Sequence, residues 1–157
     1  MRNFKEVIEA ARQAGPKTLS VAVAQDEDVL RAVKSAVESG IVKPILVGDK
    51  NKIVNIAKEI DFSLDGIEII DILDLKEATL KAVALVSSGR AQILMKGMVD
   101  TSIVLSSVLD KVVGLRTGKT LSHIAVFFVP TYHKMLMVTD AAMNIEPDLN
   151  KKKEILQ

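Results

Sequence analysis

A lysine, a glycine and two hydroxyl side chains stand between an apolar run and a helix-like stretch in the segment ILMKGMVDTSIVLSSVL. Gly97 lets the backbone turn sharply and lets a ligand approach closely. Asp100, Thr101 or Ser102 can cap the following helix, whose N-terminal amides attract an anion. Lys96 adds a mobile positive charge at the same end. The segment therefore predicts a phosphate or carboxylate pocket, although an ordinary turn and capped helix with Lys96 in solvent would have the same pattern.

A second basic, hydroxyl-bearing segment follows in VVGLRTGKTLSHIAVFF, where two glycines flank Arg116 and Thr117. Arg116 can hold a phosphate group through two parallel hydrogen bonds, which a lysine cannot do. The segment is not a P-loop, because its GKT lacks the GxxxxG frame. The alternative interpretation is a surface loop whose basic residues are solvated.

Two polar residues close to the C-terminus are further candidates. Asp140 ends a strand-like run in VTDAAMN, and Asn144 follows four residues later. Asp140 can orient a substrate, or it can bond to its own turn as aspartates often do. The two histidines, His123 and His133, have no partner at metal-ligand spacing, so we expect them to be structural and expect no metal site.

Composition narrows the classes of function. The chain has 157 residues, of which 48% are hydrophobic, and that is enough for one packed domain. It contains no cysteine, which suits a cytoplasmic protein, and neither a signal peptide nor a membrane-spanning run is recognisable. A net charge of +1 and an aromatic content of 3% argue against nucleic acid as a partner.

Short apolar runs alternate with segments of helical spacing along most of the chain. The runs predict strands at 17–24, 43–49, 66–72 and 91–97, and the spacing predicts helices at 26–40, 51–60, 74–89 and 100–110. This alternation predicts a three-layer αβα domain with a mostly parallel sheet, because parallel strands are covered on both faces. Asp74 is placed to cap its helix, with Glu77 completing a capping box.

The pattern changes near the C-terminus. Runs at 121–130 and 134–140 lie too close together for a crossover helix, so they predict an antiparallel hairpin. The tail predicts a helix with Pro147 in its first turn. Its apolar face has barely begun where the sequence stops, which suggests that 157 is not a natural domain end.

The two clusters, followed by TDAAMNIEPD, resemble the phosphate acetyltransferase and phosphate butyryltransferase family, with the butyryl branch closest. The resemblance covers essentially the whole chain. It implies exchange of coenzyme A and inorganic phosphate on a short acyl group, with acyl-CoA and phosphate as substrates and no cofactor. It also implies a homo-oligomer with a fold similar to isocitrate and isopropylmalate dehydrogenases.

The same resemblance assigns residues and a domain plan. The implied substrate-binding residues are Lys96, Gly97, Thr101, Ser102, Arg116, Thr117 and Asn144, and the implied catalytic candidates are Ser122 and Asp140. Members of the family are much longer, with main catalytic residues near the far C-terminus. We therefore expect residues 1–157 to be one α/β domain, the N-terminal part of a two-domain enzyme, with about 141–157 starting the passage to the second domain. We expect this chain alone to be inactive.

Two other functions fit the residues. The chain could be a non-catalytic module that binds anions or nucleotides, because the pocket needs no second domain. It could also be a dehydrogenase-like relative of the same fold, although no GxGxxG fingerprint is present.

Overall fold

The computed structural model describes residues 2–156, which form two compact units. The sheet unit comprises Ala11–Arg116. The hairpin unit comprises the described residues up to Ala10 together with those from Thr117 onward. The helix α1 (Phe4–Gln13) belongs partly to each unit.

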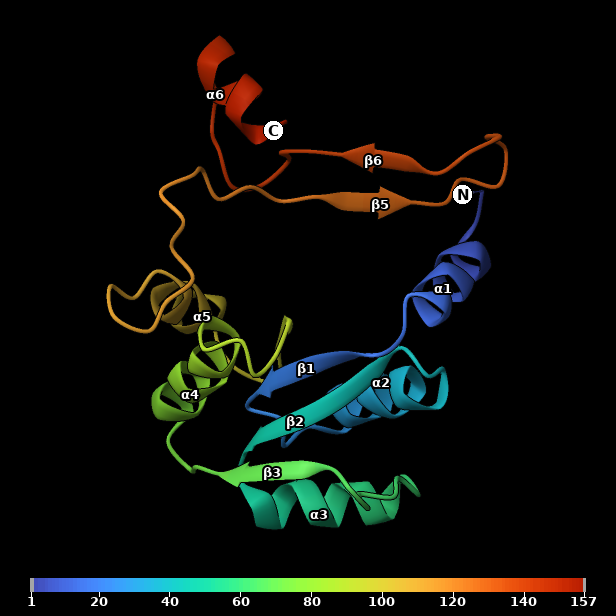
Figure 1. The fold of residues 1–157 in the computed structure, drawn as a ribbon, viewed down its shortest axis with the longest axis vertical. Helices are drawn as coiled ribbons and strands as arrows, with labels where there is room; N and C mark the ends of the chain where they lie inside the picture. The colour runs from blue at the N-terminus through green and yellow to red at the C-terminus, as the bar shows by residue number, and fades with distance from the viewer. Residues whose placement is uncertain (1, 157) are drawn as a thin grey trace. The chain divides into compact units, whose positions relative to one another are not determined.

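A four-stranded parallel sheet forms the centre of the sheet unit (Figure 1). Its strands are β1 (Lys17–Ala22), β2 (Val42–Gly48), β3 (Glu68–Asp71) and β4 (Ile93–Lys96), in the order β3-β2-β1-β4. The central strand β1 pairs with β2 and with β4, so that Ala22 lies opposite both Val47 and Lys96. The predicted parallel sheet is confirmed.

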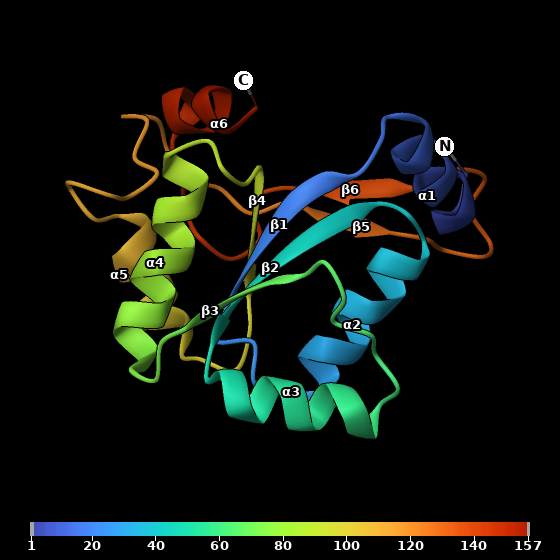
Figure 2. The same cartoon turned by 60° about the horizontal axis from the view of Figure 1, so that its bottom comes forward.

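Helices cover both faces of this sheet (Figure 2). One face carries α2 (Glu27–Glu38) and α3 (Lys50–Glu59), and the other carries α4 (Leu75–Ser87) and α5 (Thr101–Val108). Each face has its own buried core. On the α2 and α3 side the core includes Leu19, Val21, Leu30, Leu46 and Ile53. On the α4 and α5 side it includes Ala22, Val47, Ala82, Leu85 and Val104.

The two inner strands are apolar because both of their faces are covered. The last four residues of β1 and the last five of β2 are buried, whereas β3 and β4 are only partly buried. Ser20 is the polar exception in β1, and its hydroxyl donates to the carbonyl oxygen of Ala82 at 3.0 Å. The hydrogen bond satisfies a fully buried polar group and ties β1 to α4.

Aspartate side chains make capping hydrogen bonds at the starts of three of the four helices on the sheet faces. The side chain of Asp26 accepts a hydrogen bond from Val29 at the start of α2, and Asp49 does the same for Lys52 in α3. Asp74 accepts from the amides of Lys76 and Glu77, each at 2.9 Å, which confirms the predicted cap of α4. These carboxylates satisfy amides that a helix cannot satisfy itself.

The hairpin unit holds an antiparallel strand pair and a short helix. β5 (Ala125–Phe127) pairs with β6 (Leu136–Val138), and α6 (Leu149–Ile155) follows. The side chain of Glu154 in α6 accepts hydrogen bonds from the hydroxyl and the backbone amide of Thr120. In the loop between the strands, the rings of Tyr132 and His133 lie 4.6 Å apart.

Three features differ from the sequence-based expectations. Helix α1 was not predicted, although FKEVIEAARQ is strongly amphipathic. The hairpin is present, but its strands are shorter than 121–130 and 134–140, since the carbonyl of Leu121 accepts from the side chain of Asn144 and so has a partner outside the strand ladder. Pro147 lies just before the N-cap residue Asp148 and not in the first turn of α6. No helix within residues 2–156 is long and apolar enough to cross a membrane.

The cap of α4 gives a test of the fold. We expect Asp74→Ala to lower the free energy of unfolding by about 1 kcal/mol, because two amides at the start of α4 lose their acceptor. Urea unfolding measures the loss. Lys81→Ala, an exposed change in the same helix, is the control and should stay within about 0.5 kcal/mol of the unchanged protein.

Candidate functional site

The strand order places a topological switch point between β1 and β4. From β1 the chain passes outward through β2 to β3, and it then returns to add β4 on the other side of β1. In open parallel sheets, ligands bind beyond the carboxyl ends of the strands at such a point. The loop from β4 to α5, which begins with Gly97, leaves the sheet at this position.

Gly97 is in close contact with the end of β1. Its amide donates to the carbonyl oxygen of Ala22 at 2.8 Å, and the next amide, that of Met98, donates to Val23 at 3.2 Å. A Cβ atom on Gly97 would lie 2.1 Å from the carbonyl oxygen of Val23. Only glycine fits here, so the predicted close approach is made by the protein's own backbone.

Val23 itself has an unusual backbone. Its φ angle is 56°, a left-handed conformation that is strained for a β-branched residue, and its side chain is buried. Such strain costs on the order of 1–3 kcal/mol and often occurs at functional sites. The strained residue and the glycine loop lie together at the switch point.

Lys96 is exposed, but its side chain folds back onto the loop. Its ammonium group donates to the carbonyl oxygen of Val99 at 2.9 Å and lies 3.4 Å from that of Gly97. The side chain therefore folds over the loop and holds a positive charge beside the start of α5. An anion bound there would meet a charge that the loop itself positions.

The start of α5 differs from the starts of α2, α3 and α4. Asp100 occupies the N-cap position but its side chain accepts no capping hydrogen bond. Thr101 and Ser102 in the first turn are exposed. The amide of Ile103 donates to the backbone carbonyl of Asp100 at 3.0 Å, so the amides of Thr101 and Ser102, which no side chain caps, are those left for an external anion.

Arg116 lies near the opposite end of α5. Asp110 accepts hydrogen bonds from the amides of Val112 and Val113, and this turn brings the amide of Leu115 to the carbonyl of Val108 at 2.7 Å. The hydrogen bonds to these amides lower the pKa of Asp110, that from Val113 most strongly. Since α5 has eight residues, its two ends are separated by roughly 10 Å. Arg116 is exposed, and its convergence with Lys96 on one group stays a prediction.

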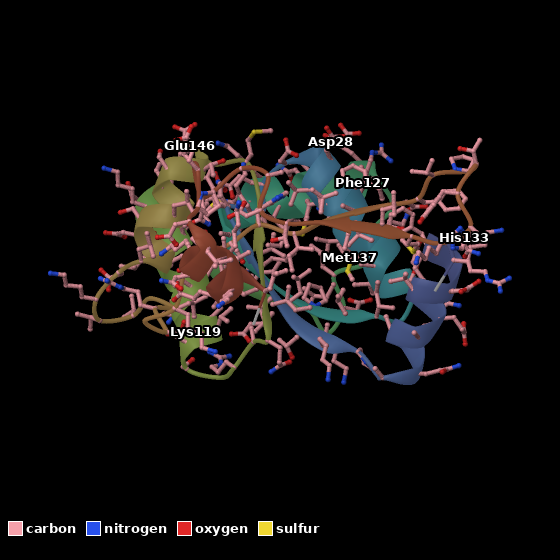
Figure 3. All side chains as sticks on the ribbon, turned by 90° about the horizontal axis from the view of Figure 1, so that it is seen from above. Asp28, Lys119, Phe127, His133, Met137 and Glu146 are labelled. Atoms are coloured by element: carbon pink, nitrogen blue, oxygen red, sulfur yellow. The ribbon has the colours of Figure 1, made fainter. Side chains whose placement is uncertain are left out.

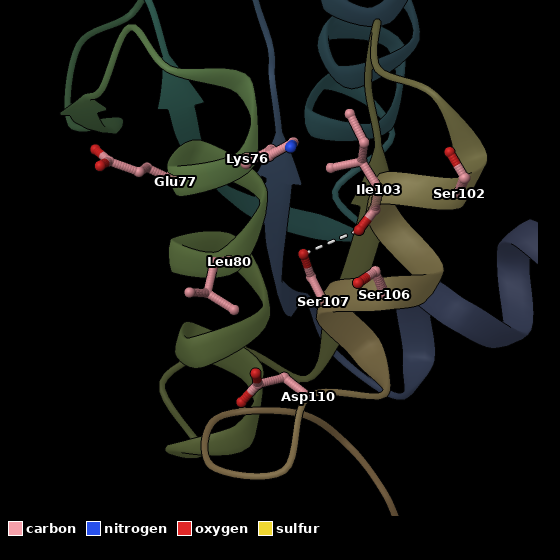
Figure 4. A pocket seen from close by; sticks show the side chains of 8 residues that line it. All are labelled: Lys76, Glu77, Leu80, Ser102, Ile103, Ser106, Ser107 and Asp110. Atoms are coloured by element: carbon pink, nitrogen blue, oxygen red, sulfur yellow. Dashed lines mark hydrogen bonds between the residues drawn. The ribbon is translucent and has the colours of Figure 1, made fainter.

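A groove of about 410 Å³ runs between α4 and α5 (Figure 4). Ser102 and Ser106 lie on its α5 side, one helical turn apart, and Lys76 comes from the first turn of α4. Its other lining residues are Glu77, Leu80, Ile103, Ser107 and Asp110. The sequence-based candidates did not include Lys76 or Ser106. The spacing of four residues between Ser102 and Ser106 would have placed both serines on one face of the helix.

The groove has electrostatically different ends. Lys76 and Ser102 belong to the first turns of their helices, where the helix dipoles are positive. Asp110 lies at the far end, just beyond α5, whereas Glu77 lines the groove from the first turn of α4. An anionic group is therefore disfavoured near Asp110, and at the other end Lys76 and the helix dipoles act against the charge of Glu77.

The remaining candidates lie in the hairpin unit: Thr117, Ser122, Asp140 and Asn144. The hydroxyl of Thr117 accepts from the amide of Lys119 at 3.4 Å. Ser122 is half-buried. The side-chain amide of Asn144 donates to the carbonyl of Leu121 at 3.0 Å and also to Asp140.

Asp140 is bonded to its own chain. Its carboxylate accepts from the amides of Ala142 and Met143, at 3.0 and 2.9 Å, and from the side chain of Asn144. The hydrogen bond from Met143 is the main reason why the pKa of Asp140 falls to about 2. A carboxylate with so low a pKa is a poor proton acceptor near neutral pH. Among the described residues, no group of three or more His, Cys, Asp or Glu side chains is placed to hold a metal ion.

Gly97 can be tested directly. We expect Gly97→Ala to destabilise the protein by about 1–3 kcal/mol, because the new Cβ would overlap backbone atoms that cannot move independently. Chemical unfolding measures the change. Met98→Ala is the matched control, since Met98 is 61% exposed one residue further along. Equal midpoints for the two variants would contradict the close approach.

Asp140 gives a pH-dependent test. Its pKa is lowered from an ordinary 3.8 to about 2, so its carboxylate stabilises the folded state fully above about pH 5 and loses this contribution as the pH falls toward 2. We expect Asp140→Asn to lower the urea midpoint at pH 7, and the gap to the unchanged protein to narrow below about pH 4. A gap that is constant with pH would show that the carboxylate's charge is unimportant.

Comparison with known proteins gives the family. Residues 3–79 and 74–157 match the family described as "Phosphate acetyl/butaryl transferase". The chain is 53% identical over 151 residues to a phosphate butyryltransferase of Clostridium beijerinckii, covering 96% of this chain and 50% of that protein. It is 47% identical over 156 residues to a phosphate butyryltransferase of Clostridium acetobutylicum, covering 99% and 52%.

The fold is shared with a phosphotransacetylase of known structure. A phosphotransacetylase from Streptococcus pyogenes matches with a TM-score of 0.80 at 18% identity, over 98% of this chain and 56% of that one. The chain spans about half the length of the curated relatives it matches. Because the family match extends over nearly the whole sequence, the chain belongs to the phosphate acetyl/butyryl transferase family.

Proposed function

We propose that this chain supplies the anion-binding part of a phosphate acyltransferase, which converts acyl-CoA and phosphate to acyl phosphate and coenzyme A. The observation that carries the proposal is the start of α5, where helix amides without a side-chain cap lie beside Lys96 at the switch point. The names of the relatives, two of them phosphate butyryltransferases, support a short acyl group such as butyryl.

The reaction requires anion binding more than redox chemistry. A phosphate oxygen attacks the thioester carbonyl and forms a tetrahedral oxyanion, and the carbon–sulfur bond then breaks to release the thiolate of coenzyme A. The site must hold phosphate against the thioester and stabilise the oxyanion with fixed donors. Coenzyme A is a substrate in this scheme, and no step calls for a cofactor.

We assign one anionic group to the start of α5. Lys96 would supply a positioned charge, the backbone from Gly97 onward would supply amides, and Thr101 and Ser102 would supply hydroxyl donors. Arg116 and Thr117 would bind a second group. The length of α5 separates its two ends by roughly 10 Å, which suits two groups of one long ligand such as coenzyme A better than a single phosphate.

We keep the polar residues of the hairpin unit as separate candidates, described within that unit alone. Asp140 would position Asn144 and not act as the base, because its lone pairs already accept hydrogen bonds and its pKa is about 2. Ser122, whose side chain is half-buried, remains the candidate for a catalytic hydroxyl.

The wider organisation is part of the proposal. We infer a two-domain cytoplasmic enzyme with a fold similar to isocitrate dehydrogenase, active as a homo-oligomer, of which residues 1–157 are the N-terminal part and about 141–157 the passage to the second domain. The coverage of the relatives supports this, since each is about twice the length matched here.

A thiol-release assay with butyryl-CoA and phosphate tests the chemistry. We expect no enzymatic turnover from the 157-residue chain and clear turnover when the second half of the Clostridium beijerinckii relative is joined to it. In that longer protein Arg116→Ala should weaken binding of substrate about 10- to 100-fold, as expected for loss of a charge-assisted hydrogen bond. Lys119→Ala, an exposed cation three residues away, is the control and should have little effect.

The alternatives give different results. Turnover by the short chain alone would show that the site is misplaced. If the short chain binds phosphate and the longer protein folds but shows no turnover, the non-catalytic binding module is favoured. Reduction of a nicotinamide cofactor by the longer protein would favour the dehydrogenase-like relative.

A further inference from the structure

Side chains from the C-terminal part of the hairpin unit hold the segment 120–123 in place. Glu154 of α6 accepts hydrogen bonds from the backbone amide of Thr120, at 3.2 Å, and from its hydroxyl. The side-chain amide of Asn144 donates to the carbonyl oxygen of Leu121 at 3.0 Å. These partners are 34 and 23 residues apart along the chain, so the contacts form only when the hairpin unit has folded.

The backbone after Ser122 is held as well. The amide of His123 donates to the carboxylate of Asp140, which also accepts from the side chain of Asn144. Asn144 therefore binds the carbonyl before Ser122, and Asp140 binds the amide after it. Lys119, which directly precedes the segment, is by contrast exposed (Figure 3).

Ser122 is the residue of this segment whose own side chain is left free. It is half-buried, and its hydroxyl makes no hydrogen bond to any residue in the range 2–156. No fully buried polar side-chain atom in that range lacks a partner, so the hydroxyl of Ser122 is accessible from solvent. With the backbone fixed on both sides, only the χ1 angle sets the position of its oxygen, and χ1 has three staggered values.

We propose that Glu154, Asp140 and Asn144 are positioning residues, which preset the hydroxyl of Ser122 to donate a hydrogen bond to the oxyanion of the acyl transfer. Donors that are fixed beforehand stabilise such an oxyanion without reorganising during the reaction. No bond to Ser122 forms or breaks in this step, because the hydroxyl only donates. The inference rests on the proposed function, and it gives Glu154 a role that the sequence did not indicate.

Amide exchange in the 157-residue chain tests the clamp without catalysis. In Glu154→Ala we expect the amides of Thr120 and His123 to exchange about five- to tenfold faster, the factor expected for loss of one or two ordinary hydrogen bonds. Glu154→Gln should exchange like the unchanged protein, since glutamine can accept from the amide and donate to the hydroxyl of Thr120. Lys151→Ala is the matched control, because it removes only the ion pair with Glu154.

Kinetics test whether the clamp acts through Ser122. The protein is the chain joined to the second half of the Clostridium beijerinckii relative, assayed with butyryl-CoA and phosphate. Ser122→Ala should lower kcat about 100-fold and change KM less than about twofold, as for loss of an oxyanion donor. Glu154→Ala should lower kcat about tenfold, but less than about twofold when Ser122→Ala is already present. Glu154→Gln should restore most of the rate.

The two experiments separate the possible failures. Equal amide exchange in Glu154→Ala and in the unchanged chain would overturn the clamp. Effects on kcat that multiply in the double variant would show that Glu154 supports the fold alone, which also overturns the proposal. A longer protein that folds but has no turnover would overturn the proposed function, and with it the role of Ser122, whatever the exchange experiment shows.

Discussion

The approach of Gly97 to the end of β1 is the constraint around which the sheet unit is arranged. The amide of Gly97 bonds to Ala22, and a side chain at residue 97 would overlap the carbonyl of Val23. This contact brings the turn after β4 against the central strand, which is paired on both sides. It also sets where α5 begins, because the helix starts four residues later. The position of the proposed anion site is thus determined by a backbone contact more than by its charged side chains.

The distribution of aspartates then determines which helix end is available. The side chains of Asp26, Asp49 and Asp74 accept hydrogen bonds from N-terminal amides of their helices. The side chain of Asp100 accepts none. A carboxylate at a helix start stabilises the helix and also occupies the position that an anionic ligand would take. Three helices therefore serve the stability of the sheet unit. The fourth helix, α5, has no side-chain cap and has Lys96 beside its start.

Sequence patterns predicted most of the sheet unit because its strands are short, apolar and separated by capped helices. Asp74 is an example, since its type and position give the helix start directly. The path of Lys96 was not predictable, because a flexible side chain chooses among partners that only the folded loop brings together. The same holds for Asp140, where sequence left open a substrate role and a turn role. The structure shows the turn bonds.

The single tyrosine of the chain gives the hairpin unit an optical label. There is no tryptophan, and Tyr132 lies in the loop between β5 and β6 with its ring beside that of His133. Intrinsic emission excited in the tyrosine band therefore comes from one place in the molecule, whereas far-ultraviolet ellipticity comes largely from α2, α3, α4 and α5 in the sheet unit. Recording both signals during one denaturant titration separates the unfolding of the two units without a dye or an added fluorophore.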